Sequence, residues 1–466
     1  MPVDTLHPSY EAHEQKARRV RDAVAGSDAI KGRGFLYLPH PQEEYETLTG
    51  DAKKIADTRY KAYKERAVWV GVTRSTHDGL LGAVFRRDPE VTLPSPIGYM
   101  EEDADGSGMS LVQFARGNVS GLMTSGRHGV LVDYPEAEDG LTREQTQGMK
   151  ATLRHYSSPS IVNWRRDGET LVLVVLREPW AKDVDEFEQD WDWQYRVLRL
   201  EDGKYTQQVY RDNQPAGEKV MPRQANGSPW QEIPFQFLGT VDNNETPDPP
   251  LLLDIADQNI AMYRNSATVE EAAHICGQPV LHIDIGETST DEWTELNPNG
   301  ISIGARRGVQ TRGGGTMAMV QAEERNLPLK LMEQRREDMV ALGAKLIERG
   351  ASNETAESVR ERSGSESANL SSVAGNVSDG IRNVLEWSLA FMGGSGEIEF
   401  ELSRQFYDVT ADPQDVMARI QELDRGLIAK SDYRTWRRKT GGIEPDRSDE
   451  DIDADVEAGG TAIGAL

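Results

Sequence analysis

Two groups of arginine residues stand out in a chain that is otherwise strongly acidic. The first group is Arg306, Arg307 and Arg312, in a glycine-rich stretch, and the second is Arg349, Arg360 and Arg362, beside a run of small and polar residues. A guanidinium group donates hydrogen bonds in a fixed fork that suits phosphate oxygens. Each arginine alone is most simply a surface residue, but the two groups are the best candidates for contact with a polyanion.

Motifs for other chemistry are scarce. The chain has no Gly-x4-Gly-Lys-Ser/Thr phosphate loop and no His-Glu-x-x-His zinc motif, so we expect no nucleotide-driven motor, no cofactor and no metal ion. Four aspartates alternate from Asp449 to Asp455 like the first ligands of a calcium loop. Ala454 and Gly460 stand where that loop requires glycine and glutamate, so we interpret the tail as a solvated acidic face.

A tryptophan-rich region offers the alternative of an enzyme. It contains Trp164, Trp191, Trp193 and Trp230. These rings could stack on a sugar or base, although packing in a core or subunit interface is the simpler interpretation. Carboxylates at Glu186, Asp190 and Asp192 would then be the acids of a hydrolase. Such an enzyme needs two acids on facing elements, whereas these three crowd one segment.

The composition bounds the possible partners. At 466 residues the chain exceeds one typical core, so at least two packed units are expected. Its formal net charge of −26 argues against tight, sequence-independent binding of nucleic acid but is compatible with a channel past which a polyanion slides. Cys276 is the single cysteine, so no intrachain disulfide can form. Without a long apolar run or a signal-peptide pattern, we expect a soluble protein made inside a cell, with no membrane partner.

Hydrophobic periodicity predicts an α+β protein. Helices are expected over residues 8–25, 42–66, 68–85 and 111–124, and residues 126–135 are expected to form a tight turn that leads into a strand. Between about 151 and 240 the period changes to 2, which predicts a β-rich region. Asp202-Gly203 indicates a hairpin there, and a shifted alternation at Leu198 and Leu200 suggests a bulge. Near the end of the chain we expect a strand over 397–402 and helices over 413–424 and 432–439.

Residues 249–393 form the centre of the predicted fold. Two long helices, from Pro250 to Cys276 and from about 328 to Gly350, bracket an insert at 279–320, for which strands and glycine-rich turns are expected. A polar loop and a third long helix, 364–393, follow. The predicted buried faces are Leu252, Ala256, Ile260, Tyr263 and Ala267 on the first helix, and Leu370, Val373, Val377, Ile381 and Val384 on the third.

This order of elements resembles the portal proteins of tailed bacteriophages, in particular a group related to a family once catalogued as a domain of unknown function. The resemblance spans nearly the whole chain and rests on dispersed motifs. They are Tyr60-x-x-Tyr63-x-x-Arg66-Ala67, the runs 79–89 and 126–133, Leu253 to Asn259, Gly277-Gln278-Pro279, and Gly426 to Lys430 before the acidic tail.

The resemblance implies a non-enzymatic, portal-like fold with long stem and tunnel helices, a β-rich wing and a small β-containing clip. The wing would be residues 1–248, the stem 249–276 and 321–349, and the clip 277–320. The tunnel loop would be 350–363, the tunnel helix 364–393, the returning wing strand 394–410, and the crown with its acidic tail 411–466. This short crown leaves little room for a helical barrel.

The resemblance also implies a location and partners. The protein would be made in the host cytoplasm and form a ring, usually twelve-fold, at one capsid vertex of the virion. Double-stranded DNA would pass through it without sequence specificity during packaging and ejection. Arg349, Asn353, Arg360 and Arg362 would contact the DNA. The clip, with Asp291, Trp293, Arg306, Arg307 and Arg312, would dock the terminase large subunit and later the head–tail adaptor, and the major capsid or scaffolding protein would hold the ring. A head-completion or minor capsid protein is the alternative within the structural class.

Overall fold

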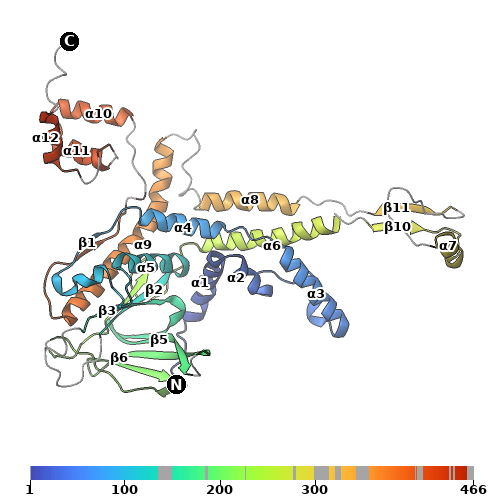
Figure 1. The fold of residues 1–466 in the computed structure, drawn as a ribbon, viewed down its shortest axis with the longest axis horizontal. Helices are drawn as coiled ribbons and strands as arrows, with labels where there is room; N and C mark the ends of the chain where they lie inside the picture. The colour runs from blue at the N-terminus through green and yellow to red at the C-terminus, as the bar shows by residue number, and fades with distance from the viewer. Residues whose placement is uncertain are drawn as a thin grey trace, which may run out of the picture.

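The computed structural model describes residues 2–134, 149–183, 187–225, 227–276, 280–298, 314–320, 327–342, 356–404, 406, 413–439, 442–443 and 447–458. A body of helices and small sheets carries one long arm, and a group of short helices lies near the C-terminus (Figure 1). Every strand pairing in the described residues is antiparallel. Helices combined with antiparallel sheets confirm the expected α+β class.

Helices of the body precede and follow the arm. Those before it are α1 (Tyr10–Ala25), α2 (Ser27–Gly32), α3 (Gly50–Arg66), α4 (Val72–Val84) and α5 (Leu111–Ser125), with 3-10 turns at Gly34–Leu36, Tyr45–Thr47, Ser95–Glu101 and Ser158–Ser160. Helix α5 shows why these boundaries form: the Ser110 hydroxyl accepts a hydrogen bond from the Gln113 amide, and the Gln113 side chain accepts one from the Ser110 amide. Gly126, in the left-handed conformation, ends the helix.

The strands form four sheets. The largest has the order β4 (Ile161–Asp167), β5 (Thr170–Asp183), β6 (Gln189–Glu201), β7 (Lys204–Arg211), β8 (Gln214–Pro215). A second has β2 (Arg127–Asp133) between β3 (Thr152–Ser157) and β9 (Phe235–Gly239). β1 (Glu90–Thr92) pairs with β12 (Glu399–Glu401), and β10 (Val280–Asp284) pairs with β11 (Thr316–Val320). The hairpin expected at Asp202-Gly203 is confirmed, with both residues at positive φ between paired Glu201 and Lys204.

The main core lies where α9 (Ala356–Phe391) crosses the second sheet and α5. The predicted inward face of α9 is confirmed, since all five of its residues are buried in this core. Gly380 lets the helix approach β9 closely, because a Cβ at that position would overlap the Leu238 side chain. One half of α9 is thereby fixed in the body.

Several expectations about element boundaries were wrong. The bulge at Leu198 and Leu200 is absent, because β6 pairs with β7 without a register shift from Tyr195 to Glu201. The helix expected from residue 42 begins at Gly50, after a 3-10 turn. The insert contains a helix, α7 (Thr290–Leu296), whose N-cap is Ser289. It is too short for its period to stand out among strands and turns.

The C-terminal helices are α10 (Pro413–Asp424), α11 (Lys430–Lys439) and α12 (Asp449–Ala458). The acidic tail is therefore helical, and it folds back on α11. Arg434 pairs with Asp453 and Arg438 pairs with Asp449. These aspartates neutralise arginines at a surface, and no group of three metal-binding side chains occurs in the described part of the chain. No helix among the described residues is long and apolar enough to cross a bilayer.

Candidate functional site: the arm and the third long helix

The arm is built by two antiparallel helices. α6 (Leu253–Cys276) lies along α8 (Leu327–Leu342), and β10, β11 and α7 lie at the end far from the body (Figure 1). The predicted buried face of α6 is confirmed. Leu252 and Ala256 join the main core, while Ile260, Tyr263 and Ala267 join a smaller core with α2 and α3.

Buried polar groups hold α6 to the body. Asn259 is fully buried: its side-chain oxygen accepts hydrogen bonds from the Thr73 amide (3.1 Å) and hydroxyl (3.0 Å), and its side-chain nitrogen donates to the Val70 carbonyl (2.8 Å). Two turns further, the Ser266 hydroxyl bonds both the amide and the carbonyl of Val68. Because these partners surround the start of α4, α6 leaves the body at a fixed angle.

Beyond Ala267 the described side chains of α6 are half-buried or exposed, and Ile275 is more than half exposed. On α8, Met339 alone is buried among the residues whose side chains are described. Arg335 of α8 donates a 2.7 Å hydrogen bond to Gln258 of α6. The arm thus buries little apolar surface within one chain, which is typical of helices that pack against other subunits.

The tip of the arm contains two of the five expected docking residues. Asp291 is exposed in the first turn of α7, and Trp293 is half-buried, with an indole nitrogen that has no hydrogen-bond partner in the described residues. Arg306, Arg307 and Arg312 lie outside the described residues. The described part of the tip is acidic, with Asp284, Glu287, Asp291, Glu292 and Glu295 on β10, α7 and the turn between them.

The expected DNA contacts fall at the start of α9. Arg349 and Asn353 lie outside the described residues. Arg360 and Arg362 were expected in a loop that extends to residue 363, but α9 begins at Ala356 and both lie within it. Ala356, Glu357, Arg360 and Glu361 are good helix formers and outweigh the nearby serines and glycine. Figure 1 shows one end of α9 standing clear of the body. The described core residues of α9, from Leu370 to Phe391, belong to its C-terminal part, so the end that stands clear is the N-terminal one.

The carboxylates of the enzyme alternative are poorly arranged for catalysis. Asp190 and Asp192 lie on the same face of β6, and both approach Lys182 of β5, at 3.8 and 2.7 Å. The hydrogen bond from Lys182 lowers the pKa of Asp192, whereas a general acid needs a raised pKa. Glu186 lies outside the described residues. The geometry gives two carboxylates on one strand, both beside Lys182, whereas a hydrolase needs two acids on facing elements.

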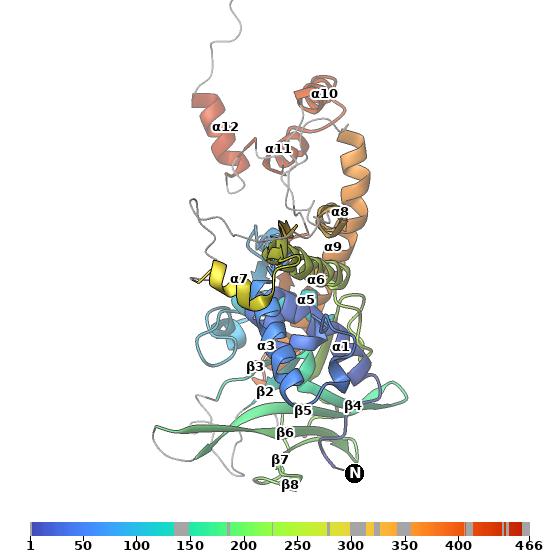
Figure 2. The same ribbon diagram turned by 90° about the vertical axis from the view of Figure 1, so that its right-hand side faces the viewer.

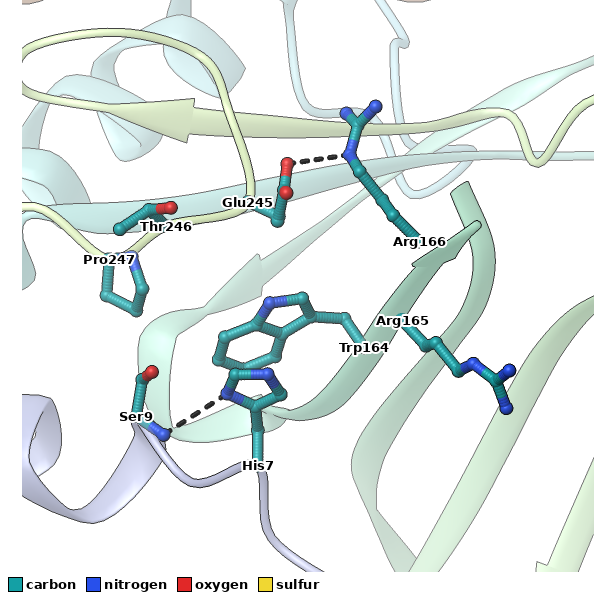
Figure 3. A pocket seen from close by; sticks show the side chains of 8 residues that line it. All are labelled: His7, Ser9, Trp164, Arg165, Arg166, Glu245, Thr246 and Pro247. Carbon is teal, nitrogen blue, oxygen red and sulfur yellow. Dashed lines mark hydrogen bonds and ion pairs between the residues drawn. The ribbon is translucent and has the colours of Figure 1, made fainter. Parts of the chain in front are cut away.

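A shallow cavity of about 310 Å³ lies where the N-terminal segment meets β4 (Figure 3). The His7 ring stacks on Trp164, with 3.8 Å between ring centroids, and accepts a hydrogen bond from the Ser9 amide. Arg166 pairs with Glu245 across the cavity at 2.7 Å. Burial, and then the charge of Arg127, lowers the pKa of His7, so the ring is neutral at pH 7. These contacts anchor the N-terminal segment against β4.

The other tryptophans divide between the core and the surface. Trp164 and Trp230 are buried, as the packing interpretation requires, and the guanidinium of Arg127 lies 3.8 Å from the Trp164 ring. Trp191 and Trp193 are half exposed or more. Sequence reasoning missed this difference between the tryptophans. It included Asn259 in the motif Leu253 to Asn259 but did not predict its buried hydrogen bonds, which no local pattern marks. The alternation of aromatic and acidic residues along 190–193 was the available signal for a surface strand.

Comparisons with known proteins give matches of different kinds. No curated protein matches the chain. Among solved structures, a chain from the virion of a native gene transfer agent particle is similar at 11% identity, with a TM-score of 0.40, over 81% of this chain and 92% of that one. A chain from the neck of the native particle, computed with C12 symmetry, has a TM-score of 0.38 at 11% identity over 78% and 89%. A chain from the neck of the empty particle, computed with C6 symmetry, has a TM-score of 0.40 at 12% identity, over 79% of this chain and 89% of that one. Residues 250–392, which span the arm and α9, match the family described as "Domain of unknown function (DUF4055)".

Proposed function

We propose that this protein is the portal subunit of a tailed-bacteriophage-type particle. It forms a ring at one capsid vertex of the virion, through which double-stranded DNA is packaged and ejected, and it joins the head to the tail. Its role is structural rather than enzymatic. The proposal is carried by one observation: a two-helix arm ends in a small β unit far from the body, and a third long helix returns to the core.

The arm supports a ring because of what it leaves exposed. A pair of long helices with few buried residues is stabilised mainly by packing on neighbours. In a ring, each subunit meets its neighbours through two different surfaces, and arms placed side by side provide such surfaces. A ring also explains how Ile275 of α6 and Leu342 of α8, both exposed in one chain, come to be covered.

The regions take their proposed roles as follows. Residues 1–248 and 394–410 form the wing, α6 and α8 the stem, and residues 277–320 the clip. Residues 411–466 form the crown. The tunnel helix begins at Ala356 and not at residue 364 as the sequence indicated, so Arg360 and Arg362 contact DNA from its first turns.

The negative charge of the chain is compatible with DNA passing through the ring and argues against tight binding of DNA. With a net charge of −26, the ring repels a polyanion over most of its surface, and a few arginines give weak contact at the narrowest point. The acidic tip of the arm, with Asp291 and Trp293, is the proposed docking surface for the terminase large subunit and the head–tail adaptor. A capsid or scaffolding protein holds the wing.

Native mass measurement tests the proposal. The purified chain at micromolar concentration is expected to give a closed ring, twelve-fold by the resemblance. The double variant Arg360→Glu, Arg362→Glu is expected to assemble normally and to package less DNA into capsids. Assembly that stops at a monomer or dimer contradicts the proposed ring. Unchanged packaging by the double variant contradicts the proposal that Arg360 and Arg362 contact DNA.

A further inference from the structure

The N-terminal residues attach the largest sheet to α1. The chain runs from the N-terminus past β4 and into α1 (Figure 2). We call residues 2–13 the strap. Hydrogen bonds of 2.8–2.9 Å tie it to the sheet, from the Val3 amide to the Asn213 side chain, from the Asn163 side chain to the Thr5 carbonyl and from the His7 amide to the Val162 carbonyl. The Tyr10 hydroxyl donates to the Pro159 carbonyl (3.0 Å), just before β4.

His7 holds the middle of the strap. Its ring stacks on Trp164 of β4 with 18° between the ring planes, and its Nδ1 atom accepts a hydrogen bond from the Ser9 amide at 3.2 Å (Figure 3). An imidazole nitrogen that accepts a hydrogen bond carries no proton. Protonation of His7 would place a proton on Nδ1, directly opposite the Ser9 N–H group, and would remove this bond.

His13 holds the end of the strap from within α1. It is 8% exposed, and its Nε2 atom lies 2.9 Å from the Ser158 hydroxyl, in the 3-10 turn that leads into β4. Burial, and then the charges of Arg127, Arg21 and Lys16, lowers the pKa of His13 to about 4. The ring is therefore neutral at pH 7, and a proton on it is disfavoured while it stays buried.

Both histidines lie near a buried cation, Arg127 of β2. Arg127 is 2% exposed, and its guanidinium lies 3.8 Å from the Trp164 ring and 4.7 Å from the Phe237 ring. Its Nε and Nη2 atoms have no hydrogen-bond partner among the described residues. The charge of Arg127 contributes to the lowered pKa of both histidines. A proton on either ring would thus add positive charge beside a cation that is already buried.

The groups around His13 do not compensate for an added proton. Glu14, its neighbour on α1, is paired with Arg21. The elements that face His13 from α5 and from the 3-10 turn present the Ser125 backbone and the Ser158 hydroxyl. Protonation of His13 would therefore favour a state in which the ring reaches water.

The carboxylates around His7 are engaged as well. The wall of the cavity beside it carries Arg165 and Arg166 of β4 and Glu245 of the loop before α6. Glu245 pairs with Arg166 at 2.7 Å, and Asp248 of the same loop accepts hydrogen bonds from two backbone amides. A protonated His7 would therefore face cations and carboxylates that already have partners.

We propose that the strap is an acid-sensitive attachment: when His7 and His13 bind protons, residues 2–13 detach from β4 and from the 3-10 turn before it, and the largest sheet becomes free to move relative to α1. Histidines of a detached strap titrate near about 6.5, so the detached state binds protons first as the pH falls. Detachment therefore increases below about pH 6.5. The inference concerns a single chain and does not depend on the proposed ring.

The displacement of the His13 pKa to about 4 sets the size of the effect. Linkage from this group alone makes the detached state about 25-fold more populated at pH 5 than at pH 7.5. His7, whose pKa is also lowered, adds to this change in the same direction.

Hydrogen exchange on the full chain tests the attachment. The opening constant of the residue 7 amide, corrected for the intrinsic exchange rate, is expected to rise at least tenfold from pH 7.5 to pH 5. At pH 5 it should change less than twofold in about 1 M urea, because a local opening exposes little surface. The Ala256 amide, which bonds the Leu252 carbonyl at the start of α6, reports the opening of the core and should exchange more slowly at both pH values.

Two variants separate the histidines from other groups that titrate. His7→Phe, His13→Gln keeps a ring on Trp164 and a hydrogen-bonding side chain beside Ser158, but neither new side chain binds a proton. Its opening constant is expected to change less than threefold between the two pH values. His274→Gln, at an exposed position near the end of α6, is the matched control and should keep the wild-type response.

Arg127→Met keeps an apolar side chain against the two aromatic rings and removes the buried charge. Its response to pH should be smaller than that of the wild type but not absent, because burial is the larger cause of the lowered pKa values. Circular dichroism at both pH values shows which variants fold.

The wild-type chain alone can overturn the inference. A residue 7 amide that exchanges as slowly as the Ala256 amide, with the same dependence on urea, shows that the strap opens only when the whole chain unfolds. An opening constant that does not rise at pH 5, or a tenfold rise that persists in the double variant, shows that the two histidines do not control the strap.

Discussion

Replacement of Asn259 by leucine is expected to loosen the attachment of the arm to the body. The buried amide of Asn259 makes three hydrogen bonds, to the Thr73 amide, the Thr73 hydroxyl and the Val70 carbonyl. Leucine has a similar volume but leaves all three partners buried and unsatisfied. At about 1 kcal/mol for each bond, the local free energy of opening should fall by about 3 kcal/mol.

Hydrogen exchange measures this loss at the site itself. Since 1.4 kcal/mol corresponds to a factor of ten, exchange of the Thr73 amide should become about 100-fold faster in Asn259→Leu. Asn265→Ala is the matched control on the same helix, because the Asn265 side-chain nitrogen has no partner among the described residues. In Asn265→Ala, the exchange rate of the Thr73 amide should change by less than threefold. Equal acceleration by the two variants would refute the view that this amide fixes α6 to α4.

Three further predictions concern the body. Burial, and then neighbouring cations, lowers the pKa of His13 to about 4, so the unfolded chain binds the proton first and stability falls as the pH drops from about 6.5. Between pH 7 and pH 4, the free energy of unfolding measured in urea should fall by up to about 3 kcal/mol because of His13. The His13→Gln variant should show a smaller dependence of this free energy on pH. Gly380→Val should cost about 1–3 kcal/mol by overpacking α9 against β9, whereas Gly82→Ala, with open space around it, should not lower the melting temperature. Arg196→Leu should cost about 3–5 kcal/mol in thermal unfolding, because it leaves Glu178 buried without its ion pair, and a loss below 1 kcal/mol would contradict this assignment.

Long amphipathic elements could be predicted from the sequence because their periodicity reports burial directly. The faces of α6 and α9 follow spacings of three and four, and all ten predicted residues are buried. Helix α10 occupies the expected range as well. In α6 and α9 one side of the helix meets a core, so hydrophobic pattern and structure carry the same information.

Short elements and polar contacts could not be predicted in this way. α7 has only seven residues, too few to show an apolar stripe, and the first residue of α9 whose side chain is described as buried is Leu370. Asn259 and Ser266 bond the backbone of a segment almost two hundred residues away, and such pairing has no local pattern. The proposed channel and docking residues depend on the orientation of neighbouring subunits, which no single chain contains.

Electron micrographs of the purified protein viewed end-on test the central claim most directly. The account predicts closed rings of uniform subunit number around an open channel wide enough for a DNA duplex, with the arms gathered around the axis. Particles without rotational symmetry, or rings without a channel, would contradict it.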